Sequence, residues 1–473
     1  MPEKTRASLI ERTVRNLRVV WQNIAGDAYD ETAASLHPDL PDDDLERLKQ
    51  QVDACLESRG GEVSARARAA ALGRAYLSLN ATGRERFIRL LAAEYAADRT
   101  RIDAAVIGVQ NADNPESRRS AEKQLRETLV ASRVKLFMQF NDLPEGIKFL
   151  VDMRAEILPL ARKDATLKAL ELDLRLLLGT WFDVGFLDLQ QITWERSPAA
   201  LLEKLIAYEA VHEIKGWDDL KNRLAPDRRC FAYFHPSMPK EPLIFVEVAL
   251  VVGMADAIDT LLDETAPLQD AAKANTAIFY SISNAQKGLA GISFGNFLIK
   301  RVVGSLSREF KGLKTFATLS PIPGFGRWLI NYFEEQKGDA LLPSEWKSIW
   351  AAAGLPQEPS ITELLKDASW TENDKLVKAL RGPLMRLCAR YLMTEKGKGG
   401  RAVDPVAHFH LSNGAGMERL NWLANRSEKG LSESAGIMIN YRYKLSNIDE
   451  NHEAYTTHGE IAASPGMRGL LKK

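Results

Sequence analysis

The chain has 473 residues, of which 45% are hydrophobic and 27% are charged, values that are average for a globular protein. Its 63 basic and 63 acidic residues give a formal net charge of zero, which argues against a nucleic-acid partner held by a global basic field. A chain of this length exceeds one ordinary hydrophobic core, so we expect two domains.

The cysteines and the chain ends indicate a compartment. Cys55, Cys230 and Cys388 are odd in number and far apart, which argues against a disulfide framework and against structural zinc. The N-terminal segment lacks the apolar stretch of a secretory signal, and no run approaches the ~18 apolar residues of a membrane span. The last residues, 471–473, are not a peroxisomal signal. We expect a soluble cytoplasmic protein with no membrane partner.

Residues 1 to about 190 predict one helix after another. Small and apolar residues recur at helical spacing in 64–79 and 85–97, and the pattern continues in 118–140. Further helices are expected at 145–161 and 165–183. This region therefore predicts an all-α bundle over 1–190, and it contains no recognisable catalytic constellation.

After Trp194 the pattern changes to strands mixed with helices, which indicates an α/β or α+β catalytic domain over 191–473. Segment 199–212 is still helical, and residues 230–251 alternate around a proline-rich turn at 236–242, which predicts a β-hairpin. The expected elements that follow are a helix at 254–264, a strand at 276–283, a helix at about 294–310, a strand at 314–320, helices at 327–335, 360–366 and 373–395, a strand near 404–411, a helix at 417–427 and a strand at 435–445.

A glycine-containing loop between a predicted strand and helix is a candidate anion site. It comprises Gln286, Lys287, Gly288, Leu289, Ala290 and Gly291. Glycines at such a junction let backbone N–H groups approach an anion at the positive end of a helix. The loop resembles the pyrophosphate loop of GNAT-type acetyltransferases, which bind coenzyme A, although Leu289 stands where that pattern has glycine. Lys287, Lys300 and Arg301 are candidates to pair with phosphates, and an ordinary strand–helix turn explains the loop as well.

Two short segments carry candidate catalytic side chains. Ser320 precedes Pro321-Ile322-Pro323-Gly324, and the residue before a proline is held in extended geometry. His408 and His410 alternate about Phe409, which on a strand places both imidazoles on one face. No carboxylate or third histidine accompanies them at metal-ligand spacing, so we expect no metal. A lone serine in a turn or a lone histidine is more often structural than catalytic.

Several segments together resemble malonyl-CoA decarboxylase. They are FLVDMRAEIL at 149–158, WF..GFLDL...TW at 181–194, EAVHEIKGWDDLKNR at 209–223, RRCFAYFHPSMPKEPL at 228–243, the segment 279–303, SPIPGF at 320–325, HFHLSNGA at 408–415 and INYRY at 439–443. The resemblance covers about 145–445. It implies a helical N-terminal domain for oligomerisation and support, and a GNAT-like mixed-sheet catalytic domain that binds CoA.

The resemblance implies decarboxylation of malonyl-CoA to acetyl-CoA and CO2, with Ser320 and His410 as the catalytic residues. It also implies a homo-oligomer, plausibly a tetramer. The family acid has no counterpart here, because Ser293 stands at its position. No cofactor is expected, since the thioester is itself an electron sink and coenzyme A is part of the substrate.

In the implied reaction, Ser320 would hydrogen-bond the malonyl carboxylate or the thioester oxygen. His410, with an ordinary pKa of ~6.5, would donate or relay a proton. Asn413 would orient His410 or the substrate or cap a helix, and Tyr441 and Tyr443 would line the acyl pocket or belong to the core. Two other functions stay open, a CoA-dependent acyltransferase and a non-catalytic scaffold that senses malonyl-CoA.

Overall fold

The computed structural model describes residues 17–24, 36–57, 61–182, 184–292, 297–336, 340–354 and 360–472. The chain divides into two compact units. Unit 1 contains Met1–Asp188, Phe234–Leu243 and Ala285–Ser293, and unit 2 contains Leu189–Tyr233, Ile244–Asn284 and Phe294–Lys473. Each unit is described by itself below.

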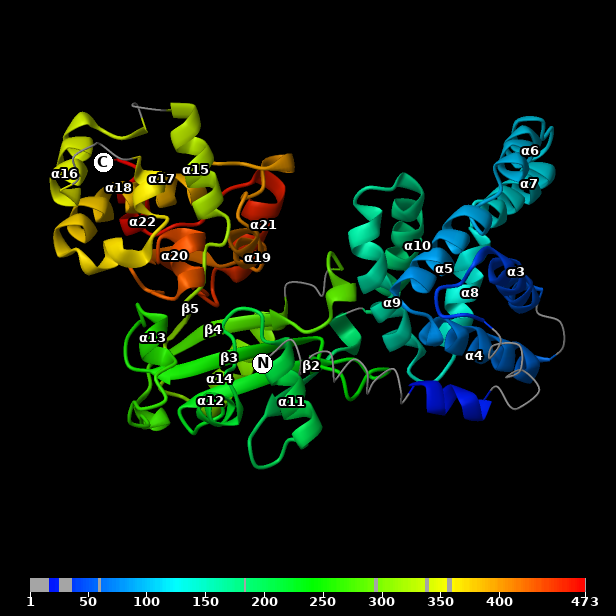
Figure 1. The fold of residues 1–473 in the computed structure, drawn as a ribbon, viewed down its shortest axis with the longest axis horizontal. Helices are drawn as coiled ribbons and strands as arrows, with labels where there is room; N and C mark the ends of the chain where they lie inside the picture. The colour runs from blue at the N-terminus through cyan, green and yellow to red at the C-terminus, as the bar shows by residue number, and fades with distance from the viewer. Residues whose placement is uncertain are drawn as a thin grey trace. The chain divides into compact units, whose positions relative to one another are not determined.

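Unit 1 is built from helices, as the sequence predicts. They are α3 (Asp42–Leu56), α4 (Glu62–Ser78), α5 (Ala81–Glu94), α6 (Arg99–Gln110), α7 (Pro115–Thr128), α8 (Ser132–Asn141), α9 (Gly146–Ala161) and α10 (Ala165–Trp181). Helix α9 buries Ile147, Leu150, Val151 and Ile157 as one apolar stripe. The helices α6 and α7 form a hairpin that projects from the rest of the unit (Figure 1), and α7 buries none of its residues.

Two segments from much later in the chain complete unit 1, and one of them is the glycine-containing loop. Gly288 packs so closely on α9 that an added Cβ would lie 1.7 Å from the Val151 carbonyl oxygen. The Arg154 guanidinium donates to the carbonyl oxygens of Gly288 and Ala290, the latter at 2.9 Å. Arg154 is buried and also pairs with Glu171 at 2.6 Å. The loop is therefore fixed to α9 by glycine packing and by one buried cation.

Unit 2 is organised around a mixed sheet of seven strands in the order β1-β2-β3-β4-β5-β7-β6. The strands are β1 (Asp188–Ile192), β2 (Arg228–Phe234), β3 (Ile244–Val251), β4 (Thr276–Asn284), β5 (Thr315–Thr318), β6 (Gly416–Asn421) and β7 (Met438–Arg442). Strands β2 and β3 form the predicted antiparallel hairpin, and β4 pairs with β5 in parallel. All eight residues of β3 are buried, so this strand lies in the core.

Helices follow and separate these strands along the chain of unit 2. They are α11 (Ala199–Tyr208), α12 (Trp217–Arg223), α13 (Ile258–Leu261), α14 (Phe297–Glu309), α15 (Phe325–Gln336), α16 (Pro343–Ala353), α17 (Ile361–Leu364), α18 (Asp374–Met393), α19 (Pro405–Ser412), α20 (Glu428–Ser434), α21 (Ile448–His458) and α22 (Pro465–Leu470). Helices α15 to α22, coloured yellow to red in Figure 1, gather together beside β5.

Two predicted elements are wrong. Residues 404–411 are not a strand, because Asp404 caps and Pro405 opens helix α19. Residues 417–427 are not a helix, because 416–421 form β6, which pairs antiparallel with β7. Short patterns of this kind match more than one type of element. The His-Phe-His alternation fits strand periodicity, whereas the Asp404-Pro405 start is a helix signal, and the helix forms.

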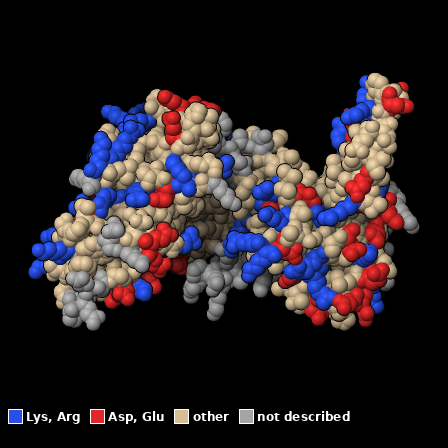
Figure 2. All heavy atoms as spheres, turned by 90° about the horizontal axis from the view of Figure 1, so that it is seen from above, with Lys and Arg blue, Asp and Glu red and all other residues tan. Residues whose placement is uncertain are grey.

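Lysine and arginine side chains lie among aspartate and glutamate side chains over the visible face of both units (Figure 2). This distribution agrees with the formal net charge of zero. Within the described residues, no helix is both long and apolar enough to cross a bilayer.

Candidate active site

Ser320 lies just beyond the end of β5, and both its backbone N–H and its carbonyl group pair with Ile439 of β7. Its N–H donates to the Ile439 carbonyl oxygen at 2.8 Å, and the Ile439 N–H donates back to the Ser320 carbonyl oxygen at 3.0 Å. The following Pro321–Gly324 segment leads directly into α15. Proline holds the preceding residue in extended geometry, and this geometry lets Ser320 form one further β-bridge to β7. Ser320 is 5% exposed.

His410 lies near the end of α19, and Asp404 holds this helix against the serine segment. One Asp404 oxygen caps α19 by accepting from the N–H groups of Val406 and Ala407, both at 3.0 Å. The other accepts from the Gly324 N–H at 3.1 Å. Gly324 has no room for a side chain, since an added Cβ would lie 2.0 Å from the Tyr391 hydroxyl. Asp404 therefore links the segment that carries Ser320 to the helix that carries His410.

The two predicted catalytic residues, 90 positions apart in the chain, meet directly. The distance from Ser320 Oγ to His410 Nε2 is 3.1 Å. His410 Nδ1 lies 2.8 Å from the Tyr443 hydroxyl, and the Ser320 hydroxyl donates to Thr318 Oγ1 at 2.8 Å. Tyr443, His410, Ser320 and Thr318 thus form a continuous buried hydrogen-bond chain.

Burial sets the charge of His410. Desolvation lowers its pKa from the ordinary value to about 3, so the imidazole is neutral at physiological pH. A buried tyrosine hydroxyl donates where its partner can accept, so we assign the Tyr443 proton to His410 Nδ1. Nε2 then carries the imidazole proton and donates to Ser320 Oγ. In this state His410 is a neutral hydrogen-bond donor and not the half-protonated group that an ordinary pKa suggests.

This burial predicts a pH-dependent stability term. The folded chain holds the pKa of His410 near 3, and the unfolded chain has it near 6.5, so the unfolded chain binds the proton first as the pH falls. Stability should therefore decrease below pH ~6.5, by about 2 kcal/mol at pH 5. We expect His410→Gln to lose about 2 kcal/mol less than the wild type between pH 7.5 and pH 5 in urea unfolding.

His212 does not disturb this comparison. Burial, followed by the charges of Arg223 and Lys429, lowers the pKa of His212 to about 3 as well. His212 contributes the same pH dependence of stability to the wild type and to His410→Gln, so its effect cancels when the two are compared. Equal losses of stability on acidification would contradict the neutral, buried state of His410.

Tyr441 and Asn413, the other residues predicted at this site, lie beside His410. The Tyr441 ring stacks on the imidazole with centroids 4.6 Å apart and an interplanar angle of 25°. The buried Tyr441 hydroxyl has no hydrogen-bond partner within the described part of the chain. Asn413 caps the end of α19, with its Nδ2 donating to the Phe409 carbonyl oxygen at 2.7 Å. The Tyr441 ring thus contacts His410, while the side chain of Asn413 holds the end of the helix.

The family is decided by comparison with known proteins. Residues 95–182 match the malonyl-CoA decarboxylase N-terminal domain, and residues 185–473 match the malonyl-CoA decarboxylase C-terminal domain. The chain belongs to the malonyl-CoA decarboxylase family. The mitochondrial malonyl-CoA decarboxylase of Rattus norvegicus is 41% identical over 362 residues, which are 74% of this chain and 73% of the rat protein.

Solved structures of the family have the same fold. The malonyl-CoA decarboxylase from Rhodopseudomonas palustris is 39% identical with a TM-score of 0.81, and the match covers 90% of this chain and 99% of that one. The malonyl-CoA decarboxylase from Agrobacterium vitis is 42% identical, also with a TM-score of 0.81, and the match covers 90% of this chain and all of that one. The resemblance found in the sequence is thereby confirmed over both units.

The loop predicted to bind coenzyme A lies in unit 1, and part of it serves the fold. Gln286 and Leu289 are buried, and Gln286 Nε2 donates to the Pro242 carbonyl oxygen at 3.0 Å. Gly288 is buried against Val151 of α9, which leaves no room for a side chain. Lys287, Ala290 and Gly291 are the exposed members. Ser293, which stands at the position of the family acid, lies outside the described residues.

Two of the three cations suggested for phosphates, Lys300 and Arg301, have protein partners. Lys300 Nζ lies 3.0 Å from an Asp449 carboxylate oxygen, and the Arg301 guanidinium lies 5.6 Å from the Tyr233 ring centroid. Neither contact excludes a phosphate, but each gives the side chain a structural role. Both residues stay candidates from sequence alone.

His408 and His410 do not share a face. They are two residues apart on helix α19, where successive residues turn by ~100°, so their side chains point in nearly opposite directions. His408 Nδ1 contacts the Tyr455 hydroxyl at 2.8 Å, and His410 contacts Tyr443. Within the described ranges, no group of three or more His, Cys, Asp or Glu side chains has the geometry to hold a metal ion.

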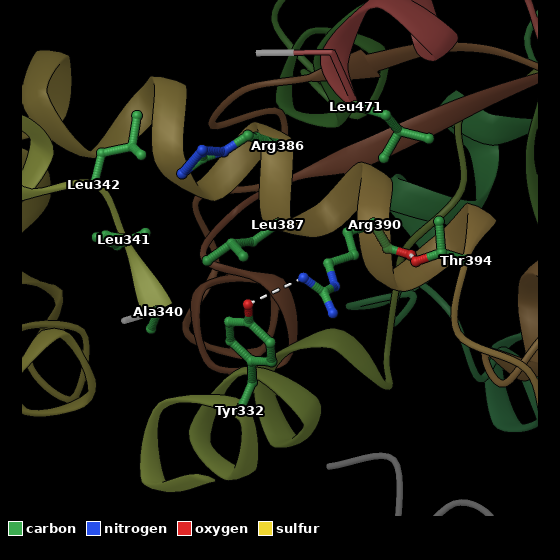
Figure 3. A pocket seen from close by; sticks show the side chains of 9 residues that line it. All are labelled: Tyr332, Ala340, Leu341, Leu342, Arg386, Leu387, Arg390, Thr394 and Leu471. Carbon is green, nitrogen blue, oxygen red and sulfur yellow. Dashed lines mark hydrogen bonds between the residues drawn. The ribbon is translucent and has the colours of Figure 1, made fainter. Parts of the chain in front are cut away.

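A separate cavity of about 570 Å³ lies among α15, α18 and the chain's last helix (Figure 3). Arg386 and Arg390 lie one turn apart on α18, and Arg390 donates to the Tyr332 hydroxyl at 3.2 Å. Arg386 pairs with Glu345 at 2.7 Å, and Arg390 approaches Glu395 at 3.5 Å. Neighbouring carboxylates thus balance the charges of both arginines that line the cavity. The cavity lining includes neither Ser320 nor His410. This cavity is therefore separate from the Ser320–His410 pair.

Two residues of the site were missed in the sequence, Thr318 and Asp404. Thr318 has no motif of its own, although it lies two residues before Ser320, and in an extended segment two such residues share a face. Asp404 before Pro405 is a helix-start signal that would also have corrected the predicted strand.

Proposed function

We propose that this chain decarboxylates malonyl-CoA to acetyl-CoA and CO2. The match to both domains of the malonyl-CoA decarboxylase family carries the proposal. The hydrogen-bonded pair of Ser320 and His410, both of which are buried, supports it.

The chemistry requires stabilisation of an enolate. Loss of CO2 from a β-carboxy thioester moves charge onto the thioester oxygen, and fixed donors aimed at that oxygen each stabilise the transition state by ~2.7–4 kcal/mol. In this proposal the Ser320 hydroxyl donates to the malonyl carboxylate or to the thioester oxygen. Orientation of the carboxylate out of the thioester plane then weakens the bond that breaks.

His410 supplies the proton that the enolate carbon needs. The substrate carboxylate brings a negative charge to the buried imidazole, and an opposite charge nearby raises the pKa of a histidine. We propose that His410 takes up a proton when malonyl-CoA binds. When the carboxylate leaves as neutral CO2, the imidazolium gives its proton to Cα, and the imidazole returns to its neutral state.

One assay tests the function. Purified protein is incubated with malonyl-CoA while acetyl-CoA and CO2 are followed. Both products should form in equal amounts. Transfer of the acyl group to an added amine or thiol without CO2 release would instead indicate an acyltransferase, and a raised melting temperature without turnover would indicate a non-catalytic sensor.

Turnover should not depend on a metal or on an added cofactor. The thioester withdraws the electron pair by itself, so the reaction needs no biotin, pyridoxal phosphate or metal. Exhaustive treatment with EDTA, followed by gel filtration, should leave kcat within about twofold of the untreated enzyme. A loss of activity that one divalent ion restores would contradict this prediction.

We propose further that the exposed loop residues Lys287, Ala290 and Gly291 contact coenzyme A, and that the chain forms homo-oligomers, as a tetramer, through its helical domain. Helix α10 leaves Leu172 and Leu176 exposed, which supports an apolar contact there. Light scattering tests the oligomer.

We also propose a cytoplasmic location. Three buried free cysteines support this location, and cell fractionation tests it.

A further inference from the structure

The Thr318 hydroxyl is the fourth member of the buried chain of Tyr443, His410, Ser320 and Thr318. Thr318 is fully buried at the end of β5. Its Oγ1 accepts from the Ser320 hydroxyl at 2.8 Å and from the Tyr441 backbone N–H at 3.1 Å. Thr318 thus touches Ser320 through its side chain and fixes the strand that carries Tyr441.

Thr318 lies where β5 and β7 separate. The two strands pair at Ala317–Arg442, and a single bridge joins Ser320 to Ile439 beyond it. Between these points side chains replace the backbone ladder. Asn440 Nδ2 donates to the Thr318 carbonyl oxygen at 2.7 Å, and the Thr318 hydroxyl takes the Tyr441 N–H. Thr318 is therefore held at its carbonyl oxygen and at its hydroxyl, and the hydroxyl has a fixed place beside Ser320.

We propose that Thr318 is a positioning residue for the decarboxylation proposed above, acting through Ser320. Ser320 has one hydroxyl proton, and in the free protein that proton points at Thr318. To donate to the substrate, Ser320 must turn this proton away. The Thr318 side chain also carries a hydroxyl, so this hydrogen bond can reverse. In the substrate complex Thr318 donates its own proton to Ser320 Oγ and still accepts from the Tyr441 N–H.

This exchange prepares Ser320 as a donor. With Thr318 O–H and His410 Nε2–H both donating to Ser320 Oγ, the serine oxygen has two donors, and its remaining proton is directed to the substrate. Hydrogen bonds in such a chain polarise one another, so each added donor strengthens the bond that Ser320 makes to the developing negative charge. Without the Thr318 hydroxyl, Ser320 loses one donor and one constraint on its direction.

The test compares Thr318→Val with Thr318→Ser, since valine keeps the shape and removes the hydroxyl, and serine keeps the hydroxyl. We expect Thr318→Val to lower kcat about 10- to 100-fold with KM changed less than about threefold. Thr318→Ser should recover kcat to within about threefold of the wild type. Thermal unfolding of each variant records the separate effect of the lost partner for the Tyr441 N–H.

A double mutant distinguishes positioning from support of the fold. If Thr318 acts through Ser320, adding Thr318→Val to Ser320→Ala should not lower kcat further. The proposal is overturned by wild-type kcat in Thr318→Val, by equal losses in Thr318→Val and Thr318→Ser, or by the same additional loss in the Ser320→Ala background. A wild-type protein that forms no acetyl-CoA would overturn the proposed function itself, which is a different result from any of these.

Discussion

Ser320→Ala and His410→Asn should each lower kcat for malonyl-CoA about 10²–10⁴-fold, the range expected when a positioned donor or proton-transfer group is removed. The two side chains are joined by a 3.1 Å contact inside the buried chain, so each depends on the other for its direction. The KM should change little, because the lost contacts serve the transition state more than the ground state. Steady-state kinetics with detection of acetyl-CoA gives both values.

The double mutant and a neighbouring histidine provide the controls. Ser320→Ala/His410→Asn should be little worse than the worse single variant, since residues that act as a unit are not additive. His408→Asn should be much milder, because His408 lies on another face of α19 and bonds Tyr455. Wild-type-like kcat in either single variant, or an equal loss in His408→Asn, would show that the catalytic pair is wrongly assigned.

Arg223→Met should destabilise unit 2 by about 3–5 kcal/mol, the cost of leaving buried charges without their partner. Arg223 is buried and contacts both Asp219 oxygens, at 2.8 and 3.1 Å, and a Glu247 oxygen at 3.1 Å. It also donates to the carbonyl oxygens of His212 and Glu213, both at 2.9 Å. Removal of this one cation therefore takes a donor away from two carboxylates and from two carbonyl groups.

The chain offers a matched control for this experiment. Lys273 and Asp270 form an exposed pair in the same unit at 3.7 Å, and Lys273→Met should change stability by less than ~1 kcal/mol. Burial, and then the charge of Glu209, raise the pKa of Glu247 to about 8 against the effect of Arg223. Adding Glu247→Gln to Arg223→Met should therefore recover part of the loss. Urea midpoints measure all four proteins, and equal midpoints for Arg223→Met and Lys273→Met would contradict the role of this network.

Local sequence patterns predicted the helices and strands correctly where a hydrophobic repeat extends over many residues. The helices of unit 1 and the hairpin of β2 and β3 extend over enough residues for a repeat to be recognised, and each repeat buries one face. Helix α9 shows this, since the stripe of Ile147, Leu150, Val151 and Ile157 is buried as predicted. The predictions for the short elements around the site were wrong, because a few residues match both the helical and the strand period. Residues 416–421 become a strand only by pairing with β7.

The sequence by itself determined the helical and mixed-sheet parts and the family, since these depend on long repeats and on motifs. It also predicted Ser320 and His410 as a pair, and the structure brings their side chains together. Only the tertiary structure decided the state of that pair. Burial makes His410 neutral, and the long-range contacts of Thr318, Asp404 and Tyr443 set the direction of each hydrogen bond. The physical reason is that a pKa and a hydrogen-bond direction depend on which groups surround a side chain. Those groups come from distant segments, as Ser320 and His410 show at 90 positions apart, and no local pattern connects them.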